Sequence, residues 1–230
     1  MQLFFSAHIE ENTVFLDADE TRHCKVLRKT EGDQVQVLDG KGLLIDCRIH
    51  SIRKDSAELE IIARNRYPRQ RPYYFHLYIA PTKQNERMEW MLEKAIEVGL
   101  DEITFIQTEH SEKARVNTGR LERIAVSALK QSGQYYLPKI NPICKLGQVE
   151  AKGMLLAHCG PGEKKSLREL CYPLADNALI RIMIGPEGDF SPSEIERMIR
   201  QGAQPVHLGS SRLRTETAGL YCAVMLSGLV

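Results

Sequence analysis

The chain of 230 residues has little cysteine, and no two cysteines stand at metal-ligand or redox spacing. The absence of a CxxC motif argues against a disulfide framework and against a zinc site. Scattered cysteines of this kind are typical of reduced thiols, so we expect a cytoplasmic protein. The six are Cys24, Cys47, Cys144, Cys159, Cys171 and Cys222.

Long apolar runs are also missing. No stretch approaches the roughly 20 apolar residues that a membrane-spanning helix needs, so no membrane partner is expected. The first residues, MQLFFSAHIEENT, have neither a basic flank nor a long apolar region, and we therefore expect no signal peptide.

An excess of charge of one sign is absent as well. Lys and Arg number 31 and Asp and Glu number 30, for a net charge of +1. This balance excludes a nucleic-acid-binding protein that is basic over its whole surface, but it leaves room for a local basic face. The hydrophobic residues, 43% of the chain, are enough for a sizeable core.

Several motifs of common enzyme classes are lacking. No GxGxxG follows a strand, which argues against a nicotinamide-dependent enzyme, and the histidines show no metal-ligand spacing such as HExxH. The segment GPGEKKS, residues 160–166, lacks the spacing of a phosphate-binding P-loop, and no GxSxG indicates a hydrolase. No metal ion is therefore expected.

Residues 1–70 predict a small β-rich domain. Residues 33–49 alternate apolar and polar side chains around the turn DGKG (39–42), which is a strong hairpin signal, and residues 56–65 alternate again. A short helix is expected within residues 17–32, closed by Gly32.

Residues 71–230 predict an α/β domain. Apolar strands alternate with amphipathic helices, a pattern typical of a parallel sheet covered on both faces. The expected strands are 74–80, 102–107, 153–159, 178–185 and 204–209, and the expected helices are 85–99, 119–133, 191–202 and 217–229.

Three of these strands end at glycine. The strand RIMI (181–184) ends in GPEG (185–188), and SPSE (191–194) then forms a capping box that begins a helix. Two other strands end at Gly160 and Gly209. Ligands bind beyond the carboxyl ends of parallel strands, and glycine lets the backbone approach them. One shared pocket lined by main chain, suited to an adenine, is therefore predicted; ordinary tight turns are the alternative.

The segment RLRTETAGL, residues 212–220, begins a helix that is apolar on all sides. Such a helix is expected to be buried, and Thr215 or Thr217 can cap it. Arg214 and Glu216 then need a partner, which is each other, solvent or a ligand. Charged groups beside a glycine-lined pocket are candidates for a functional site, whereas the alternative is a plain core helix.

Local clusters of basic residues are candidates for contact with a polyanion. Residues 64–71 contain four arginines and no acid, and Arg87 on the helix 85–99 has Trp90 and Met91, not an acid, one turn on. Each cluster is either a solvated face or a phosphate track. The basic residues of the first helix are Arg22, Lys25, Arg28 and Lys29.

The order of the motifs resembles the SPOUT methyltransferases and, within them, the 16S ribosomal RNA (uracil-N3)-methyltransferase family. The resemblance rests on HCKVLRKTEGDQVQVLDG, ERMEWMLEKAIEVG, ALKQSGQYYLPKI, IGPEGDFSPSEIE and LGSSRLRTETAGL, and it covers nearly the whole chain. It implies an α/β fold in which a PUA-like β-barrel over residues 1–70 precedes a SPOUT domain over residues 71–230. That domain would hold a mostly parallel sheet and a trefoil knot, a rare exception to unthreaded chains.

The same resemblance implies ligands and partners. The cofactor would be S-adenosylmethionine, the substrate N3 of one uridine in the 16S rRNA of the small ribosomal subunit, and the enzyme a homodimer with its cofactor site near the subunit interface. RNA contacts are expected at Arg22, Lys25, Arg28, Lys29 and Arg87. Cofactor contacts, mostly through the backbone, are expected at Leu156, His158, Gly160, Ile184, Gly185, Glu187, Gly188, Leu208, Gly209, Leu213, Arg214, Thr215, Glu216 and Ala218.

The chemistry of uracil methylation suggests two catalytic residues. Loss of the N3 proton spreads negative charge onto O2 and O4, where an enzyme has to hold a cation or N–H donors. We expect Arg214 to stabilise or position that anion, and Glu216 to accept the proton or to orient Arg214. Two rival functions stay open: a SPOUT methyltransferase for another RNA base or for transfer RNA, and an RNA-binding protein without catalysis.

Overall fold

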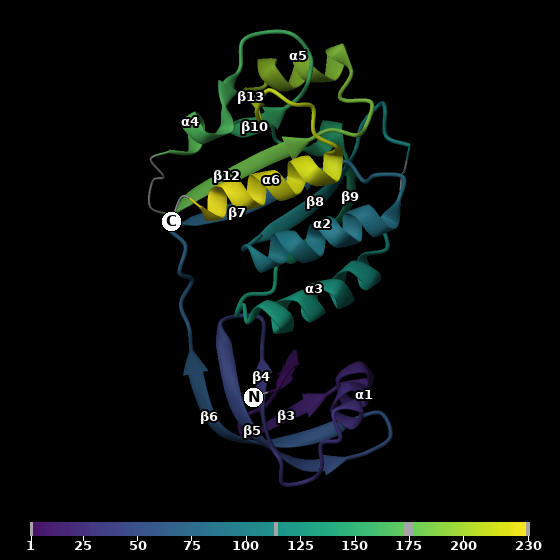
Figure 1. The fold of residues 1–230 in the computed structure, drawn as a ribbon, viewed down its shortest axis with the longest axis vertical. Coiled ribbons are helices and arrows are strands. Elements are labelled where there is room, and N and C mark those ends of the chain that lie inside the picture. Colours follow the sequence, from purple (N-terminus) through teal and green to yellow (C-terminus); the bar gives the residue numbers. More distant parts are fainter. Residues whose placement is uncertain (1, 113–114, 173–176, 229–230) are drawn as a thin grey trace. The chain divides into compact units, whose positions relative to one another are not determined.

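The computed structural model describes residues 2–112, 115–172 and 177–228, which fold into two compact units (Figure 1). The first unit contains the chain up to residue 70 together with residues 129–137. The second contains residues 71–128 and the chain from residue 138 onward.

The first unit is a curled sheet of six strands with one helix. Its strand order is β1-β4-β5-β6-β3-β2; β1 is parallel to β4, and the other neighbouring pairs are antiparallel. The expected small barrel takes the form of this curled half-barrel. The elements are β1 (Leu3–Phe5), β2 (His8–Ile9), β3 (Thr13–Leu16), α1 (Ala18–Val26), β4 (Gln34–Leu38), β5 (Leu43–Ile52) and β6 (Ala57–Arg66).

The hairpin between β4 and β5 forms where the sequence predicts it. The Oδ1 atom of Asp39 accepts the amides of Lys41 and Leu43 at 2.6 and 2.8 Å. Gly40 and Gly42 have φ angles of 69° and 94°, which residues with a side chain rarely adopt. The hairpin therefore owes its register to one carboxylate and two glycines.

Residues 129–137, which include the end of α3 (Thr118–Ser132), pack within the first unit. Leu129 is fully buried in a cluster with Leu38 and Leu44. The ring of Tyr135 stacks on that of Tyr67 with centroids 4.0 Å apart. The first unit is therefore made of two separate pieces of chain.

The second unit is built on a seven-stranded sheet of order β11-β13-β10-β12-β7-β8-β9, and each neighbouring pair is parallel. The predicted parallel sheet is confirmed. Its strands are β7 (Tyr73–Ile79), β8 (Glu102–Gln107), β9 (Lys139–Lys145), β10 (Met154–Ala157), β11 (Lys165–Ser166), β12 (Ala178–Ile184) and β13 (Gln204–His207). Its further helices are α2 (Asn85–Glu97), η1 (Leu146–Gln148), α4 (Leu167–Cys171), α5 (Pro192–Arg200) and α6 (Thr215–Ser227).

Helices cover both faces of the middle of this sheet. Figure 1 shows α2 and α6 side by side, and a Cβ atom added to Gly219 of α6 would lie 3.0 Å from Ile79 and 3.4 Å from Met91 of α2. On the opposite face, Met183 of β12 and Leu156 of β10 pack with Met198 of α5. Glycine at position 219 thus permits the close packing of α6 on β7.

The chain returns to the middle of the sheet after forming β13, the strand next to the edge strand β11. β13 pairs with β10, on the side away from β7, whereas α6 packs against β7 and β12. The loop between β13 and α6 therefore passes the carboxyl end of β12, where the Oγ1 atom of Thr215 donates to the carbonyl of Gly185 at 3.1 Å. This path brings the ends of β10, β12 and β13 together.

Candidate functional site

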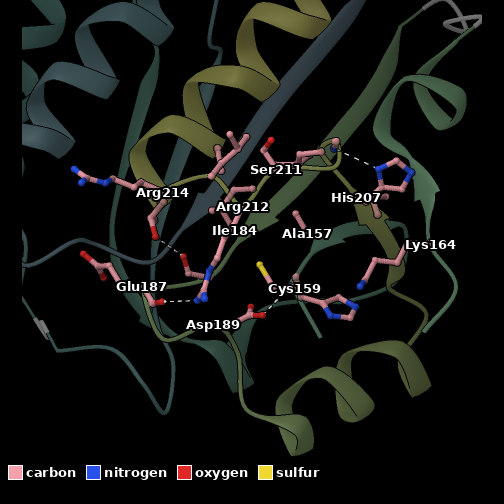
Figure 2. Close-up of a pocket in the computed structure, with 18 of the residues that line it drawn as sticks. Ala157, Cys159, Lys164, Ile184, Glu187, Asp189, His207, Ser211, Arg212 and Arg214 are labelled. Carbon is pink, nitrogen blue, oxygen red and sulfur yellow. Dashed lines mark hydrogen bonds between the residues drawn. The ribbon is translucent and has the colours of Figure 1, made fainter. Parts of the chain in front are cut away.

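A cavity of about 510 Å³ opens where β10, β12 and β13 end (Figure 2). Its walls are the three loops that follow these strands, together with the start of α6. This is the edge at which parallel α/β sheets bind ligands. Ten of the expected cofactor residues line it: His158, Ile184, Gly185, Glu187, Leu208, Gly209, Leu213, Arg214, Thr215 and Ala218.

Four expected cofactor residues lie outside the lining of this cavity. Leu156 is fully buried in the core between β10 and α5, and Glu216 is buried beside α2. Gly160 and Gly188 belong to the loops but do not line the space. The residues of the lining that sequence reasoning missed are Ala157, Cys159, Lys164, Pro186, Asp189, Val206, His207, Ser210, Ser211 and Arg212.

The loop after β12, residues 185–189, has each of its carbonyl groups occupied by a donor. Two donors come from the chain around the start of α6, one from the loop after β8, and one from the loop itself. The bonds are Thr215 Oγ1 to Gly185 O (3.1 Å), Asp189 N to Pro186 O (2.9 Å), Arg212 Nη2 to Glu187 O (3.3 Å), and His110 Nδ1 to Gly188 O (3.2 Å) and to Asp189 O (3.0 Å).

Two amides of the same loop have no partner within the described chain. Within the described ranges, no group accepts a hydrogen bond from the backbone N–H of Glu187 or Gly188. Because the carbonyls are occupied and these amides are not, the loop presents donors. Such donors suit the acceptor nitrogens of a heterocycle or the oxygens of a carboxylate.

Two glycines of this loop have side chains of the protein close to them. A Cβ atom at Gly185 would lie 3.0 Å from the ring of Phe190, and one at Gly188 would lie 3.2 Å from the Cβ atom of His110. The sequence predicts glycine here for the approach of a ligand. The structure shows that both glycines also admit neighbouring side chains of the protein itself.

Asp189 links two walls of the cavity. Its Oδ2 atom accepts the amide of Cys159, in the loop after β10, at 2.7 Å, and its Oδ1 atom accepts the amide of Phe190 at 2.8 Å. Its backbone has a φ of 63°, a region that aspartate tolerates better than most residues. The carboxylate therefore links the loops after β10 and β12.

His158 is a polar group whose hydrogen bonds are incomplete. Both ring nitrogens are buried, and neither has a hydrogen-bond partner among the described residues. Burial lowers the pKa of His158, and nearby Lys164 lowers it further, while Asp189 opposes the change. A neutral imidazole in a cavity lining, with unsatisfied nitrogens, can be completed by a polar ligand.

The two arginines before α6 behave differently. The guanidinium of Arg212 reaches the carbonyl of Glu187, whereas that of Arg214 extends to another side (Figure 2). Arg214 is exposed, and no described carboxylate lies within ion-pair distance of it. Its positive charge is therefore available at the edge of the cavity.

Glu216 has a partner that the sequence did not suggest. Its carboxylate lies 3.7 Å from the guanidinium of Arg87 in the first turn of α2, and no bond to Arg214 is found among the described residues. Arg87, expected to face RNA or solvent, therefore contacts α6.

The basic residues of the first unit lie on α1 and the turn after it. Arg22, Lys25 and Arg28 are exposed and Lys29 is half-buried. Arg22 pairs with Asp19 at 3.1 Å, and the Nζ atom of Lys25 donates to the carbonyl of Lys54 at 2.8 Å. Of these four cations, Arg28 and Lys29 make no ion pair within the described chain and do not bond to a carbonyl as Lys25 does, so they are available to a partner.

Two kinds of feature are missing from the described ranges. No group of three or more His, Cys, Asp or Glu side chains there could hold a metal ion. No helix there is both long and apolar enough to cross a membrane.

Comparison with known proteins covers both units. Residues 69–227 match the family model described as an RNA methyltransferase domain, and residues 16–62 match an RNA methyltransferase PUA domain. The chain is 28% identical to the Ribosomal RNA small subunit methyltransferase E of Buchnera aphidicola, over 98% of this chain and 92% of that protein.

Two solved structures share the whole fold. A probable rRNA-methyltransferase from Porphyromonas gingivalis is 38% identical, with a TM-score of 0.87 over 100% of this chain and 98% of that one. The Ribosomal RNA small subunit methyltransferase E of Neisseria gonorrhoeae, bound to S-adenosyl methionine, is 27% identical, with a TM-score of 0.85 over the same shares. The expected fold, a PUA-like unit followed by a SPOUT α/β domain, is confirmed.

Proposed function

This chain belongs to the RNA methyltransferase family, and we propose that it transfers the methyl group of S-adenosylmethionine to N3 of one uridine in 16S ribosomal RNA. The observation that carries the proposal is the cavity at the ends of β10, β12 and β13, whose middle loop offers free amide donors. A relative of the same fold is a small-subunit rRNA methyltransferase bound to S-adenosyl methionine.

The cavity fits this cofactor in size and in chemistry. Its volume of about 510 Å³ lies within the range of roughly 300–1,000 Å³ that is usual for small-molecule sites. The amide of Glu187, which lines the cavity, would bind an acceptor atom of the cofactor, and the unsatisfied ring of His158 would complete its hydrogen bonds there. When bound, the cofactor supplies an electrophilic methyl group.

Arg214 is the residue proposed to act on the uracil. Its exposed guanidinium stands at the edge of the cavity without a carboxylate partner among the described residues. A free cation placed there would stabilise the charge that develops on O2 and O4 as N3 loses its proton. The same contact would orient N3 toward the cavity.

Glu216 is proposed to have a structural role rather than to accept the proton. Because its carboxylate is buried and faces Arg87, its contribution to catalysis would be to fix the start of α6, which carries Arg214 at its N-cap. The acceptor of the N3 proton would then be solvent or a group of the RNA.

The first unit is proposed as the RNA-binding platform. It matches an RNA methyltransferase PUA domain, and its helix α1 and the following turn carry Arg28 and Lys29 without ion-pair partners in the described chain. Cations of this kind bind phosphates and release their counterions.

We also propose a homodimer that acts in the cytoplasm on the small ribosomal subunit. Trp90 of α2 and Tyr221 and Val224 of α6 are 47%, 42% and 48% exposed, on two helices that pack together. Exposed large apolar side chains on two neighbouring helices are compatible with an interface to a second copy of the chain. The cytoplasmic assignment is supported by six free cysteines.

A comparison of ribosomal RNA with and without the protein tests the proposal. Small subunits from a deletion strain should lack one N3-methyluridine in 16S rRNA, and incubation of those subunits with the purified protein and S-adenosylmethionine should restore it. Loss of a methyl group from transfer RNA or from another base would instead indicate a SPOUT methyltransferase with a different RNA target. Unchanged RNA, together with no heat of binding for the cofactor, would favour an RNA-binding protein without catalysis.

A further inference from the structure

The middle loop of the cavity is held by a segment that does not line the cavity. The backbone amide of Glu109, after β8, donates to the Oε1 atom of Glu194 at 2.9 Å. The Nδ1 atom of the next residue, His110, lies 3.0 Å from the carbonyl of Asp189 and 3.2 Å from that of Gly188. A carbonyl only accepts, so the Nδ1 atom of His110 carries the proton.

Glu194 anchors the same segment to α5. Its Oε2 atom accepts the amide of Ser191 at 3.0 Å as half of the capping box, while Oε1 accepts the amide of Glu109. Glu194 is 9% exposed, and both of its carboxylate oxygens accept a hydrogen bond. The loop after β8 is thus fixed to α5 and to the cavity loop at adjacent residues.

Asp189 connects the loop after β8 to the loop after β10, on the opposite wall of the cavity. Its carbonyl accepts from His110, and its Oδ2 atom accepts the amide of Cys159 at 2.7 Å. Three loops, which follow β8, β12 and β10, are therefore connected through one residue. Asp189 is one of three residues other than glycine with positive φ in the described chain, a conformation that favours glycine. Glycine at position 189 could adopt this φ angle, but it has no carboxylate that could accept the amide of Cys159.

We propose that Asp189, held in place by His110, is a positioning residue that sets the width of the cavity before the methyl donor binds. The proposal rests on the proposed function only in the identity of that ligand. Loss of the hydrogen bond between Asp189 and Cys159 would free the amide of Cys159 and let the loop after β10 move. Ligand binding would then have to order this loop. Such ordering weakens affinity without changing the contacts of the bound state.

Four variants separate this role from a direct contact with the ligand. Asp189→Gly keeps the backbone conformation and removes both carboxylate bonds, whereas Asp189→Asn keeps an oxygen for only one of the two amides. His110→Ala removes the support at a residue outside the cavity lining, and His110→Gln offers an amide donor in its place. His8→Ala, a histidine with 68% side-chain exposure in the first unit, is the matched control.

Two measurements on the full chain test the idea. Calorimetry should give a dissociation constant for S-adenosylmethionine that is about tenfold higher in Asp189→Gly and about threefold higher in Asp189→Asn and His110→Ala, as expected for lost hydrogen bonds to a charged or buried group. His110→Gln should recover part of the affinity. In the protein without cofactor, hydrogen exchange at the amide of Cys159 should be faster in Asp189→Gly, and His8→Ala should match the wild type in both.

The outcomes separate the two proposals. If the wild type binds S-adenosylmethionine and Asp189→Gly binds within twofold of it, or exchanges the Cys159 amide at the wild-type rate, the positioning role is wrong. If His110→Ala binds as the wild type does while Asp189→Gly is weakened, Asp189 acts by direct contact and the support from His110 is refuted. If the wild type itself shows no binding, the proposed function fails, and the exchange experiment still decides whether the link holds the loop.

Discussion

The guanidinium of Arg87 lies 3.7 Å from the carboxylate of Glu216, so an ion pair joins the first turns of α2 and α6. The two partners are unequal: the side chain of Glu216 is 8% exposed and that of Arg87 is 36% exposed. The Oε2 atom of Glu216 is buried and has no hydrogen-bond partner within the described ranges. A buried carboxylate depends strongly on the one cation beside it.

Removal of Arg87 should therefore destabilise the protein. We expect Arg87→Ala to lower the free energy of unfolding by about 2 kcal/mol, less than the usual loss for a fully buried pair because Arg87 is partly solvated. Glu216→Gln should cost less, since it leaves no buried charge. Urea unfolding measures both, with Lys83→Ala as the control because its pair with Glu112 is exposed on both sides. An Arg87→Ala variant as stable as Lys83→Ala would contradict the argument.

Arg214 should be needed for the chemical step but not for cofactor binding. Arg214→Ala is expected to lower kcat by about 10²-fold or more, as for loss of one group that stabilises a developing oxyanion. Its dissociation constant for S-adenosylmethionine should stay within about threefold of the wild type, since most cofactor contacts are expected from the backbone. Methyl transfer to small subunits and calorimetry measure the two effects, and Arg200→Ala, on the exposed end of α5, is the control. Full activity in Arg214→Ala would remove this role.

Cys159 should report occupation of the cavity. It is the exposed cysteine that lines this space, whereas burial raises the pKa of Cys47 to about 12 and that of Cys171 to about 11. A thiol with a raised pKa is a poor nucleophile. Alkylation should therefore modify Cys159 first, and saturating S-adenosylmethionine should slow that step at least several-fold. Loss of the added mass in the variant Cys159→Ala would identify the alkylated site. If the rate of alkylation of Cys159 were the same with and without S-adenosylmethionine, the cofactor would bind elsewhere.

The unpaired cations near α1 should make RNA affinity depend on salt. Reversing Arg28 and Lys29 to glutamate should weaken binding to 16S rRNA fragments of any sequence to a similar degree. The slope of log affinity against log salt should become shallower by about 1–2, since each lost phosphate contact contributes roughly 0.7–0.9. Arg200→Glu in the second unit changes the net charge equally per residue and should have little effect. Equal effects of the two changes would mean that α1 is not the platform.

His76 should make stability depend on pH. Its Nε2 atom lies 2.7 Å from the Oγ1 atom of Thr104, and burial lowers its pKa from 6.5 to about 4, with Lys139 and Arg181 acting in the same direction and Glu102 opposing. Because the folded pKa is the lower one, the unfolded chain binds the proton first as pH falls. Stability should be fully present above pH 6.5 and decrease toward pH 4, by on the order of 3 kcal/mol.

Denaturant unfolding at several pH values tests this point. His76→Gln should flatten the change between pH 6.5 and 4, while His8→Gln, on an exposed side chain, should not. His158, whose pKa is lowered first by burial, contributes to the pH dependence in the same direction. If His76→Gln leaves the pH dependence as it was, His76 is not its source.

Elements with strong periodicity could be predicted from the sequence, because their pattern is local. Residues 102–107 form β8 as expected, and the capping box of Ser191 and Glu194 begins α5. Strand β9 was missed: it is half-buried and contains Pro142, so its pattern does not alternate clearly. The two residues of β11 are a strand only because β13 lies beside them.

The site could be predicted in its backbone and not in its side chains. Glycine at the ends of β10, β12 and β13 identified the loops, since that signal depends on local chain geometry. The partners of Asp189 and Glu216 come from other loops and helices, and spacing rules within one helix could not find them. The spacing rule for a helix considers only an acid one turn along α2 as a partner of Arg87, whereas the acid lies on α6.

The two-piece construction of the first unit limits how this protein can be divided. A fragment that stops at residue 70 would lack Leu129, which buries Leu38 and Leu44, and Lys130, whose Nζ atom lies 2.5 Å from the buried carboxylate of Glu20. It would expose apolar surface and leave a charge without its partner, so it should aggregate when expressed alone. Exchange of this domain between relatives therefore requires a second graft, at residues 129–137, in the same gene.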